Sequence, residues 1–336
     1  MYNITQHIYT HTHKITAKME DSSNTIIPSP TDVGALANRI NFQTRDAHNK
    51  INTFMGIKMA IAMRHGFIYR QGILAYYYVF DAIEQEIDRL LNDPVTEEEL
   101  QTSTILKQFW LEDFRRSTQI YKDLRLLYSN TFKSTESLNE FLATFQKPPL
   151  LQQFINNIHE NIHKEPCTIL SYCHVLYLAL FAGGKLIRSN LYRRLGLFPN
   201  FEKLSQKELV KKGTNFFTFS DLGPTEETRL KWEYKKNYEL ATRTELTEAQ
   251  KLQIISVAEG IFDWNFNIVA EIGELNRREL MGKFSFKCIT YLYEEWMFNK
   301  DSATRRALHT VMLLVLSIIA IWVLYFLVKK SFLSIV

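Results

Sequence analysis

Apolar residues recur every three or four positions along most of this chain, which is the spacing of amphipathic helices. The segment Ser29-Pro30-Thr31-Asp32 supplies N-cap chemistry for a first helix, and a second helical pattern runs from residue 69 to residue 91. Further amphipathic stretches cover residues 104–128, 136–162, 167–195, 225–240 and 247–280, and residues 213–224 are the most loop-like interior segment. The first two patterns predict these inward residues: Val33, Leu36, Ala37, Ile40, Ala47 and Ile51, then Ile73, Tyr77, Phe80, Ile83, Ile87 and Leu90.

Because alternating runs are few, and because only 12 Gly and 8 Pro interrupt 336 residues, the pattern predicts an all-α protein. We expect a disordered extension over residues 1–30, a single helical domain over residues 31–280 and a connecting segment over residues 281–306. Helices joined by short polar connections form a bundle, and bundles place their ligands between facing helices.

The formal net charge of +4 does not predict a nucleic-acid-binding protein. Residues 1–18 contain two basic and no acidic residues, and residues 301–336 contain four basic residues and one acidic residue. The body between them therefore carries 34 basic and 35 acidic side chains. The three cysteines, Cys167, Cys173 and Cys288, show no C-x-x-C spacing, so we expect core thiols in a reducing compartment.

Residues 307–328 form an uncharged run of 22 residues between Arg305-Arg306 and Lys329-Lys330. At 1.5 Å per residue this run spans about 33 Å, enough to cross a bilayer. The sequence therefore predicts a transmembrane tail anchor, with residues 329–336 as a short lumenal tail and the helical domain in the cytosol. The basic pairs on both sides do not orient the segment, and the endoplasmic reticulum is the default membrane.

Two adjacent glycines, Gly183 and Gly184, lie inside the apolar helix pattern of residues 170–188. Each glycine costs about 1 kcal/mol of helix stability relative to alanine and leaves bare backbone. One interpretation is a tight helix–helix crossing, and the other is a kinked helix wall over a flat ligand.

His48, in TRDAHNKI, lies on or beside the first apolar stripe, where an imidazole can hold haem iron or can be a satisfied core histidine. Lys231 and Lys235 lie one helical turn apart with Tyr234 beside them, and Arg45 lies one turn before His48. These cations are either solvated charge or a clamp on a dianionic ligand.

The segment His159-Glu160-Asn161-Ile162-His163 matches H-E-x-x-H, a zinc-protease pattern. The extended form needs Gly at 166 and His at 169, where this chain has Pro166 and Ile169, and no acidic residue occurs from residue 166 to residue 200. Without a third ligand nearby, the two histidines are better interpreted as a polar helix end.

Taken in order, the segments TRDAHNKI, YVFDAIEQEIDRL, IHENIHKEP, LYLALFAGGKL, NFFTFSDL and the region from LKWEYKK to AEIGEL resemble the heme oxygenase family over residues 31–275. The resemblance, with the C-terminal anchor, is to fungal membrane-anchored members, and it implies the family's single-domain helical fold. It implies that His48 is the proximal iron ligand, that Gly183 and Gly184 lie in the distal helix, and that Arg45, Lys231 and Lys235 meet the propionates, with Tyr234 among the residues at the haem. Phe262 and Asn265 match a stretch that lines the far side of the haem pocket.

The implied reaction is the oxidative opening of haem to biliverdin, carbon monoxide and ferrous iron, with electrons from NADPH through cytochrome P450 reductase. Iron recovery from haem is the expected use.

Three positions depart from the family pattern. Leu180 stands where the family has a distal aspartate that orders water, Ala179 replaces a glycine, and Asn52 replaces a glutamate that supports the proximal histidine. His174 or Tyr177 would substitute for the missing proton relay, or would simply be packing residues. Two alternatives therefore stay open, namely a haem-binding sensor or carrier that does not open the ring, and a tail-anchored helical adaptor without a cofactor.

Overall fold

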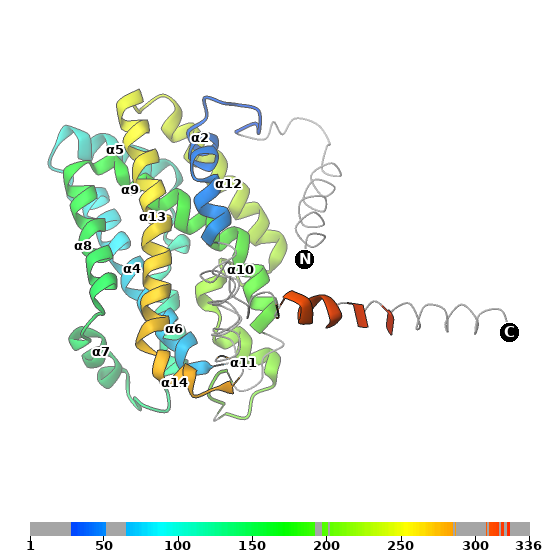
Figure 1. The fold of residues 1–336 in the computed structure, drawn as a ribbon. Coiled ribbons are helices and arrows are strands. Elements are labelled where there is room, and N and C mark those ends of the chain that lie inside the picture. The colour runs from blue at the N-terminus through cyan, green and yellow to red at the C-terminus, as the bar shows by residue number, and fades with distance from the viewer. Residues whose placement is uncertain are drawn as a thin grey trace. The chain divides into compact units, whose positions relative to one another are not determined.

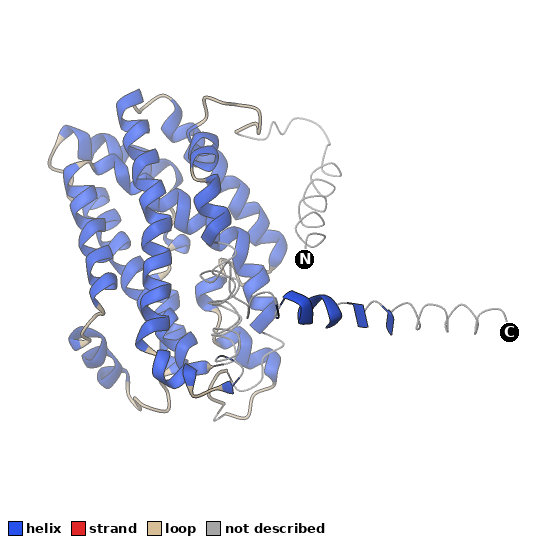
Figure 2. Cartoon of the chain, viewed as in Figure 1, coloured by secondary structure: helices blue, strands red, loops and turns tan. Residues whose placement is uncertain are grey.

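The computed structural model describes residues 28–51, 65–191, 197–200 and 202–284, together with residues 286, 307, 309–315, 317–318 and 321–322. It divides into two compact units, residues 1–273 and residues 274–336. Across the described ranges the regular structure is helical and contains no strand, which confirms the all-α prediction (Figure 2). The predicted extension lies almost wholly outside the described residues.

The first unit is a bundle of helices joined by short connections (Figure 1). Its longer helices are α2 (Leu36–Gln43), α4 (Gly66–Asn92), α5 (Glu97–Phe109), α6 (Ser117–Leu127), α7 (Thr135–Thr144), α8 (Pro149–Lys164), α10 (Leu178–Leu191), α12 (Pro224–Arg243) and α13 (Glu248–Leu275). Its shorter segments are η1 (Glu112–Phe114), η2 (Pro166–Thr168), α9 (Ile169–Tyr172), η3 (Cys173–Tyr177), α11 (Gln206–Lys212) and η4 (Asn215–Phe217).

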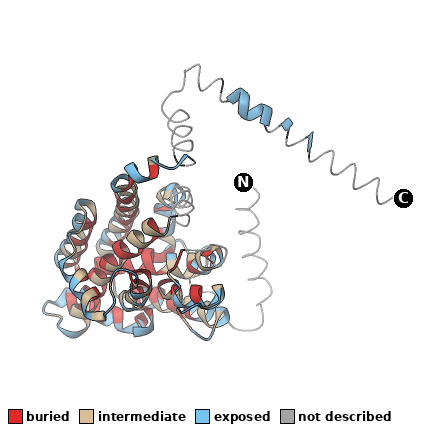
Figure 3. Ribbon diagram, turned by 90° about the horizontal axis from the view of Figure 1, so that it is seen from below, coloured by how far each residue is buried: buried red, intermediate tan, exposed pale blue. Residues whose placement is uncertain are grey.

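Helix α4 forms the centre of this unit, because it packs against α5, α6, α8 and α9. Its inward residues follow the predicted spacing, and Ile83, Ile87 and Leu90 are completely buried. Figure 3 shows the buried residues gathered on the facing sides of the helices. Tyr77, predicted inward, is only partly buried.

Two long predicted helices are interrupted in the structure. The stretch 104–128 is divided among α5, η1 and α6, and the stretch 136–162 is divided between α7 and α8. The second interruption has a clear cause, because Pro148 and Pro149 lack the N–H that would continue α7, and Pro149 instead occupies the first turn of α8.

The start of the first helix also differs from the prediction. Helix α2 begins only at Leu36, and Ala35 at its N-cap has no side-chain cap. Asp32 instead accepts a hydrogen bond of 3.1 Å from the backbone N–H of Gly34 in the preceding turn. Val33, predicted inward, is therefore 88% exposed.

The helix that carries the two glycines runs from η2 through α9 and η3 to α10. Its departure from α-helical geometry is the π-helical segment Cys173–Tyr177, and α10 remains helical through Gly183 and Gly184. The π-helical irregularity therefore lies more than a turn before the glycines, and a kink at the glycines themselves stays a prediction. Among the described residues, Pro166–Leu191 alone has the length and apolar composition of a membrane span, but 61% of its most apolar window is buried, as in a core helix.

The second unit contains the end of α13, α14 (Arg277–Met281) and the described residues of the predicted anchor. Those described residues of 307–328 are helical and exposed, with Leu314 at 58% and Ile321 at 65%. The bilayer span itself stays a prediction. Cys167 and Cys173 are buried free thiols in the first unit, as expected, and Cys288 lies outside the described residues.

Candidate functional site

His48 lies in the helical residues 45–51, and its backbone N–H donates to the Thr44 carbonyl oxygen at 2.8 Å. Its imidazole is exposed and stands edge-on to the ring of Phe262 on α13, with the ring centroids 6.0 Å apart. The structure thus brings together two residues that are 214 positions apart and that the family resemblance assigned to one haem pocket. Asn52 lies outside the described residues.

Asn265, one turn after Phe262, is buried and uses its amide within the protein. Its Nδ2 donates to the Ile261 carbonyl oxygen at 2.7 Å, and its Oδ1 accepts from the Tyr76 hydroxyl at 2.8 Å. Asn265 therefore ties α13 to α4 behind the Phe262 position.

The predicted cation pair, Lys231 and Lys235, lies partly buried on α12. Both amines lie near the Trp232 ring, at 4.9 Å and 5.1 Å from its centroid. Burial lowers the pKa of both lysines, and the charge of Lys231 lowers the pKa of Lys235 further. Within the described part of the chain neither amine has a carboxylate partner, so the two charges form a site suited to a dianion.

Two other predicted residues of this group lie differently. Arg45 is exposed. Tyr234, between the two lysines, is completely buried, and its hydroxyl donates to the Cys173 carbonyl oxygen at 2.8 Å. Tyr234 thus contacts the π-helical segment on the buried side of α12 and does not share the face of the two lysines.

His174 and Tyr177 both lie in that π-helical segment. His174 is buried, its Nε2 lies 3.2 Å from the Asn41 Oδ1, and its Nδ1 has no hydrogen-bond partner among the described residues. Burial, assisted by the charge of Lys235, lowers the pKa of His174 to about 3, so the imidazole is neutral. Tyr177 is completely buried and donates its hydroxyl to Glu84 at 3.0 Å. This contact fits a packing residue better than a proton relay.

The two glycines have separate roles. A Cβ on Gly184 would lie 2.9 Å from the carbonyl oxygen of Phe217 in η4, so close backbone packing requires this glycine. A Cβ on Gly183 would meet no described atom within 4 Å. Gly184 therefore fits the tight-crossing interpretation, and Gly183 leaves bare backbone beside open space. Leu180, at the position of the family's aspartate, is partly buried.

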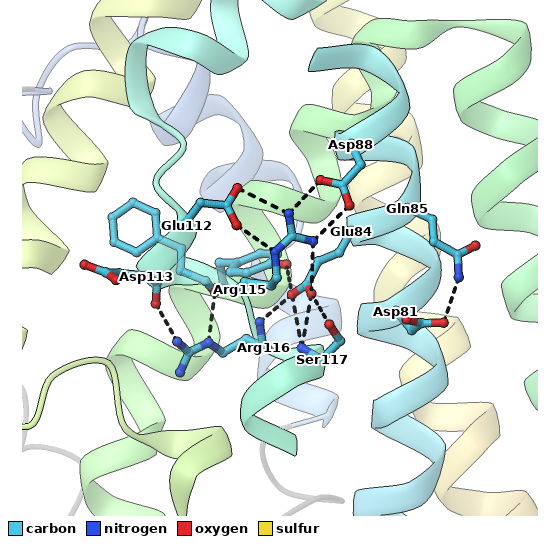
Figure 4. A network of polar contacts seen from close by, with 11 residues as sticks. Asp81, Glu84, Gln85, Asp88, Glu112, Asp113, Arg115, Arg116 and Ser117 are labelled. Atoms are coloured by element: carbon cyan, nitrogen blue, oxygen red, sulfur yellow. Dashed lines mark hydrogen bonds and ion pairs between the residues drawn. The ribbon is translucent and has the colours of Figure 1, made fainter. Parts of the chain in front are cut away.

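A buried polar network joins α4 to the start of α6 and to the π-helical segment, and sequence reasoning missed it (Figure 4). Glu84 is 1% exposed and accepts hydrogen bonds from the Arg116 and Ser117 backbone N–H groups, the Ser117 hydroxyl and Tyr177. Burial raises the pKa of Glu84, and these donors oppose that shift. A signal was present, because Glu84 falls on the inward face defined by Phe80 and Ile87.

Arg116 and Asp123 extend the network to η4. Arg116, 1% exposed, donates to the carbonyl oxygens of Thr218 at 2.7 Å and Phe114 at 2.9 Å. Asp123 accepts from the backbone N–H groups of Asn215 at 2.9 Å and Phe216 at 2.8 Å. Together they fix η4, whose Phe217 carbonyl lies against Gly184, so the network positions the glycine-bearing helix.

These features define an all-helical protein with an exposed His48 against α13, and with two partly buried lysines that have no carboxylate partner among the described residues. The family model for heme oxygenase matches residues 34–271, and the chain belongs to the heme oxygenase family.

The chain is also similar to individual proteins with related names and to solved structures. The chain is 99% identical over 318 residues to the heme-binding protein HMX1 of Saccharomyces cerevisiae, which covers 95% of this chain and all of that protein. It is 25% identical to a heme oxygenase of Rhodella violacea over 66% of this chain and 79% of that protein. The solved structure of heme oxygenase-2 from Synechocystis, in complex with heme and NO, matches with a TM-score of 0.59 at 18% identity, over 76% of this chain and 92% of that one.

Proposed function

We propose that the protein binds haem through His48 and opens its ring to biliverdin, carbon monoxide and ferrous iron. The supporting observation is that segments far apart in the sequence meet around this residue. The His48 imidazole stands edge-on to the ring of Phe262 on α13, and Asn41, seven positions before His48, contacts His174. The candidate iron ligand therefore lies next to a residue of a second element that the family resemblance assigns to the haem pocket.

The residues present fit haem. An imidazole nitrogen of His48 is a suitable iron ligand, and the amines of Lys231 and Lys235, which have no carboxylate partner among the described residues, supply counter-charges for two propionates. Gly183 offers backbone without a side chain, so that a planar ring can approach α10 closely. When bound, haem supplies the iron that activates dioxygen and is also the substrate.

Proton supply is where this chain differs. The Leu180 side chain has no polar atom with which to hold water, so we expect that role from backbone groups of α10 or from the Nδ1 of His174, which has no hydrogen-bond partner among the described residues. His174 is suited to accept a hydrogen bond and not to deliver a proton, because its low pKa keeps the imidazole neutral.

The remaining parts of the proposal follow the family. Electrons come from NADPH through cytochrome P450 reductase, residues 307–328 anchor the protein in the endoplasmic reticulum membrane, and iron recovery is the physiological use. The exposed apolar helix at Leu314 and Ile321 supports the anchor.

The competing function is haem binding without ring opening. Leu180 favours it, and so does the name of the 99% identical relative, a heme-binding protein. A tail-anchored adaptor without a cofactor is the third possibility. It gives no reason for two partly buried lysines without a carboxylate partner among the described residues.

The deciding experiment reconstitutes the full chain with hemin, adds reductase and NADPH, and follows biliverdin absorbance and released ferrous iron. We expect biliverdin to form in the parent protein and His48→Ala to lose both the axial-ligand spectrum and the product. Persistent intact haem over many reductive cycles overturns ring opening and leaves haem binding, and an unchanged spectrum in His48→Ala overturns the iron site.

Leu180→Asp restores the family's residue, and we expect it to accelerate ring opening. Ala179→Asp is the matched control, because it adds the same charge at the neighbouring, exposed position.

A further inference from the structure

The histidines of the H-E-x-x-H segment have a third donor that the sequence order concealed. Glu86 on α4 places its Oε1 at 2.6 Å from the Nδ1 of His159 and at 3.2 Å from the Nε2 of His163, both on α8. One donor atom from each residue lies within 4.8 Å of the other two. The H-E-x-x-H pattern predicts a third ligand after the second histidine, whereas Glu86 lies 73 residues before His159.

From this cluster we infer a binding site for a divalent first-row transition metal at Glu86, His159 and His163. Two imidazoles and one carboxylate are the donor set of sites for Zn²⁺ and Fe²⁺, whereas Ca²⁺ and Mg²⁺ take oxygen donors. The site is separate from His48 and from the lysine pair, and it does not depend on haem.

The geometry needs little adjustment to hold an ion. Donors at about 2.0–2.1 Å from a tetrahedral ion lie about 3.4 Å apart, and the three donor atoms here all lie within 4.8 Å of one another, so each donor pair needs to shift by at most about 1.4 Å. The two imidazoles can make that shift because their side chains are 34% and 59% exposed. The exposed side of the site leaves room for water as a further ligand.

The carboxylate of Glu86 is held in position by burial and by Arg89. It is 4% exposed, and its other oxygen, Oε2, accepts a hydrogen bond of 2.8 Å from the Nε of Arg89. Arg89 also pairs with Glu99, so its charge is shared between two carboxylates. This support holds Oε1 toward the histidines, and hydrogen bonds of this kind orient the ligating carboxylates of metal sites.

A metal here would join α4 to α8, two helices that pack directly against each other. We therefore expect metal binding to raise the thermal stability of the protein with or without hemin. At a hundredfold excess of Zn²⁺ over its Kd, the expected rise in Tm is about 5 °C.

The experiment titrates Co²⁺ into the full chain with His7, His11 and His13 replaced by Gln, because those histidines are a second source of metal binding. We expect one Co²⁺ per chain, visible by its d–d absorption, displaced by Zn²⁺ and by anaerobic Fe²⁺ but not by Ca²⁺. His163→Gln and, separately, His159→Gln should each weaken Co²⁺ binding by at least about tenfold. Lys164→Gln, at the exposed next position, is the matched control and should bind like the parent.

Equal Co²⁺ binding by His163→Gln and the parent, or the absence of stoichiometric binding, overturns the inference. Circular dichroism and the hemin spectrum establish that each variant is folded. Repeating the titration in His48→Ala separates this site from the haem site, since Co²⁺ binding should be unchanged there.

Discussion

Two groups of buried charge in this protein are built in opposite ways. The Glu84 network fills its hydrogen-bonding capacity with protein groups, and even Arg116 is enclosed by carbonyl oxygens and the Phe219 ring, 4.1 Å from its guanidinium carbon. The Lys231 and Lys235 pair has no carboxylate partner within the described residues, and burial lowers both pKa values. A charge that the protein satisfies stabilises the fold, whereas a charge left unsatisfied is available to a ligand.

The largest effect should come from removing one member of the satisfied group. Glu84→Ala leaves Arg116, Ser117 and Tyr177 without their shared acceptor, and we expect a loss of about 3–5 kcal/mol of unfolding free energy. Urea denaturation of the hemin-free protein measures it. Asp81→Asn, three residues earlier on α4 with a single exposed hydrogen bond to Gln85, should change stability by less than about 0.5 kcal/mol. A similar loss in both variants would contradict the comparison.

The two glycines give the next contrast. Gly184→Ala places a Cβ 2.9 Å from the Phe217 carbonyl oxygen, which the Arg116 and Asp123 contacts hold in place. We expect a loss of about 1–3 kcal/mol. Gly183→Ala meets no described atom, so it should be neutral or stabilise the helix by up to about 1 kcal/mol. Thermal unfolding of both variants tests this, and equal destabilisation would remove the distinction between packing and open space.

Replacing Lys231 or Lys235 should weaken hemin binding without lowering the unfolding free energy. Lys231→Gln and Lys235→Gln should each weaken hemin binding by about tenfold, because a charge-assisted contact is lost. The unfolding free energy of the hemin-free protein should stay equal or rise, since a buried charge without a partner is removed. Hemin titration and urea denaturation measure the two effects, with exposed Lys236→Gln as the control. Unchanged hemin affinity would mean that the pair is not a propionate site.

The smallest effect concerns His174, next to Lys235. Its pKa in the folded protein, about 3, lies below the ordinary value of 6.5, so the unfolded chain binds the proton first as the pH falls. The stability that the neutral imidazole contributes is therefore present above about pH 6.5 and is lost progressively toward pH 3. Between about pH 7.5 and about pH 5.5 the parent should lose about 1 kcal/mol more than His174→Gln. Urea denaturation at the two pH values measures this, and parallel losses would mean that folding does not lower the pKa of His174.

Local periodicity was enough for the helices whose faces are simple. The pattern of α4 predicted Ile83, Ile87 and Leu90 inward, and the spacing of Lys231 and Lys235 predicted a shared face. Periodicity did not predict the break between α5 and α6, because the apolar spacing continues across residues where the helix is interrupted. It also failed for Tyr234, which belongs to the buried face although it stands between two lysines.

Apolar spacing within three or four positions predicted the all-helical class and the shared face of the cation pair. The family, with His48 as its candidate iron ligand, came from the order of segments that resemble heme oxygenases. Contacts between distant segments gave the rest: which glycine packs and which stays bare, that Glu84 and Arg116 brace the glycine-bearing helix, and that Glu86 meets His159 and His163. Helical spacing specifies which side of a helix is buried, but not which helix lies against it, and these features depend on that neighbour.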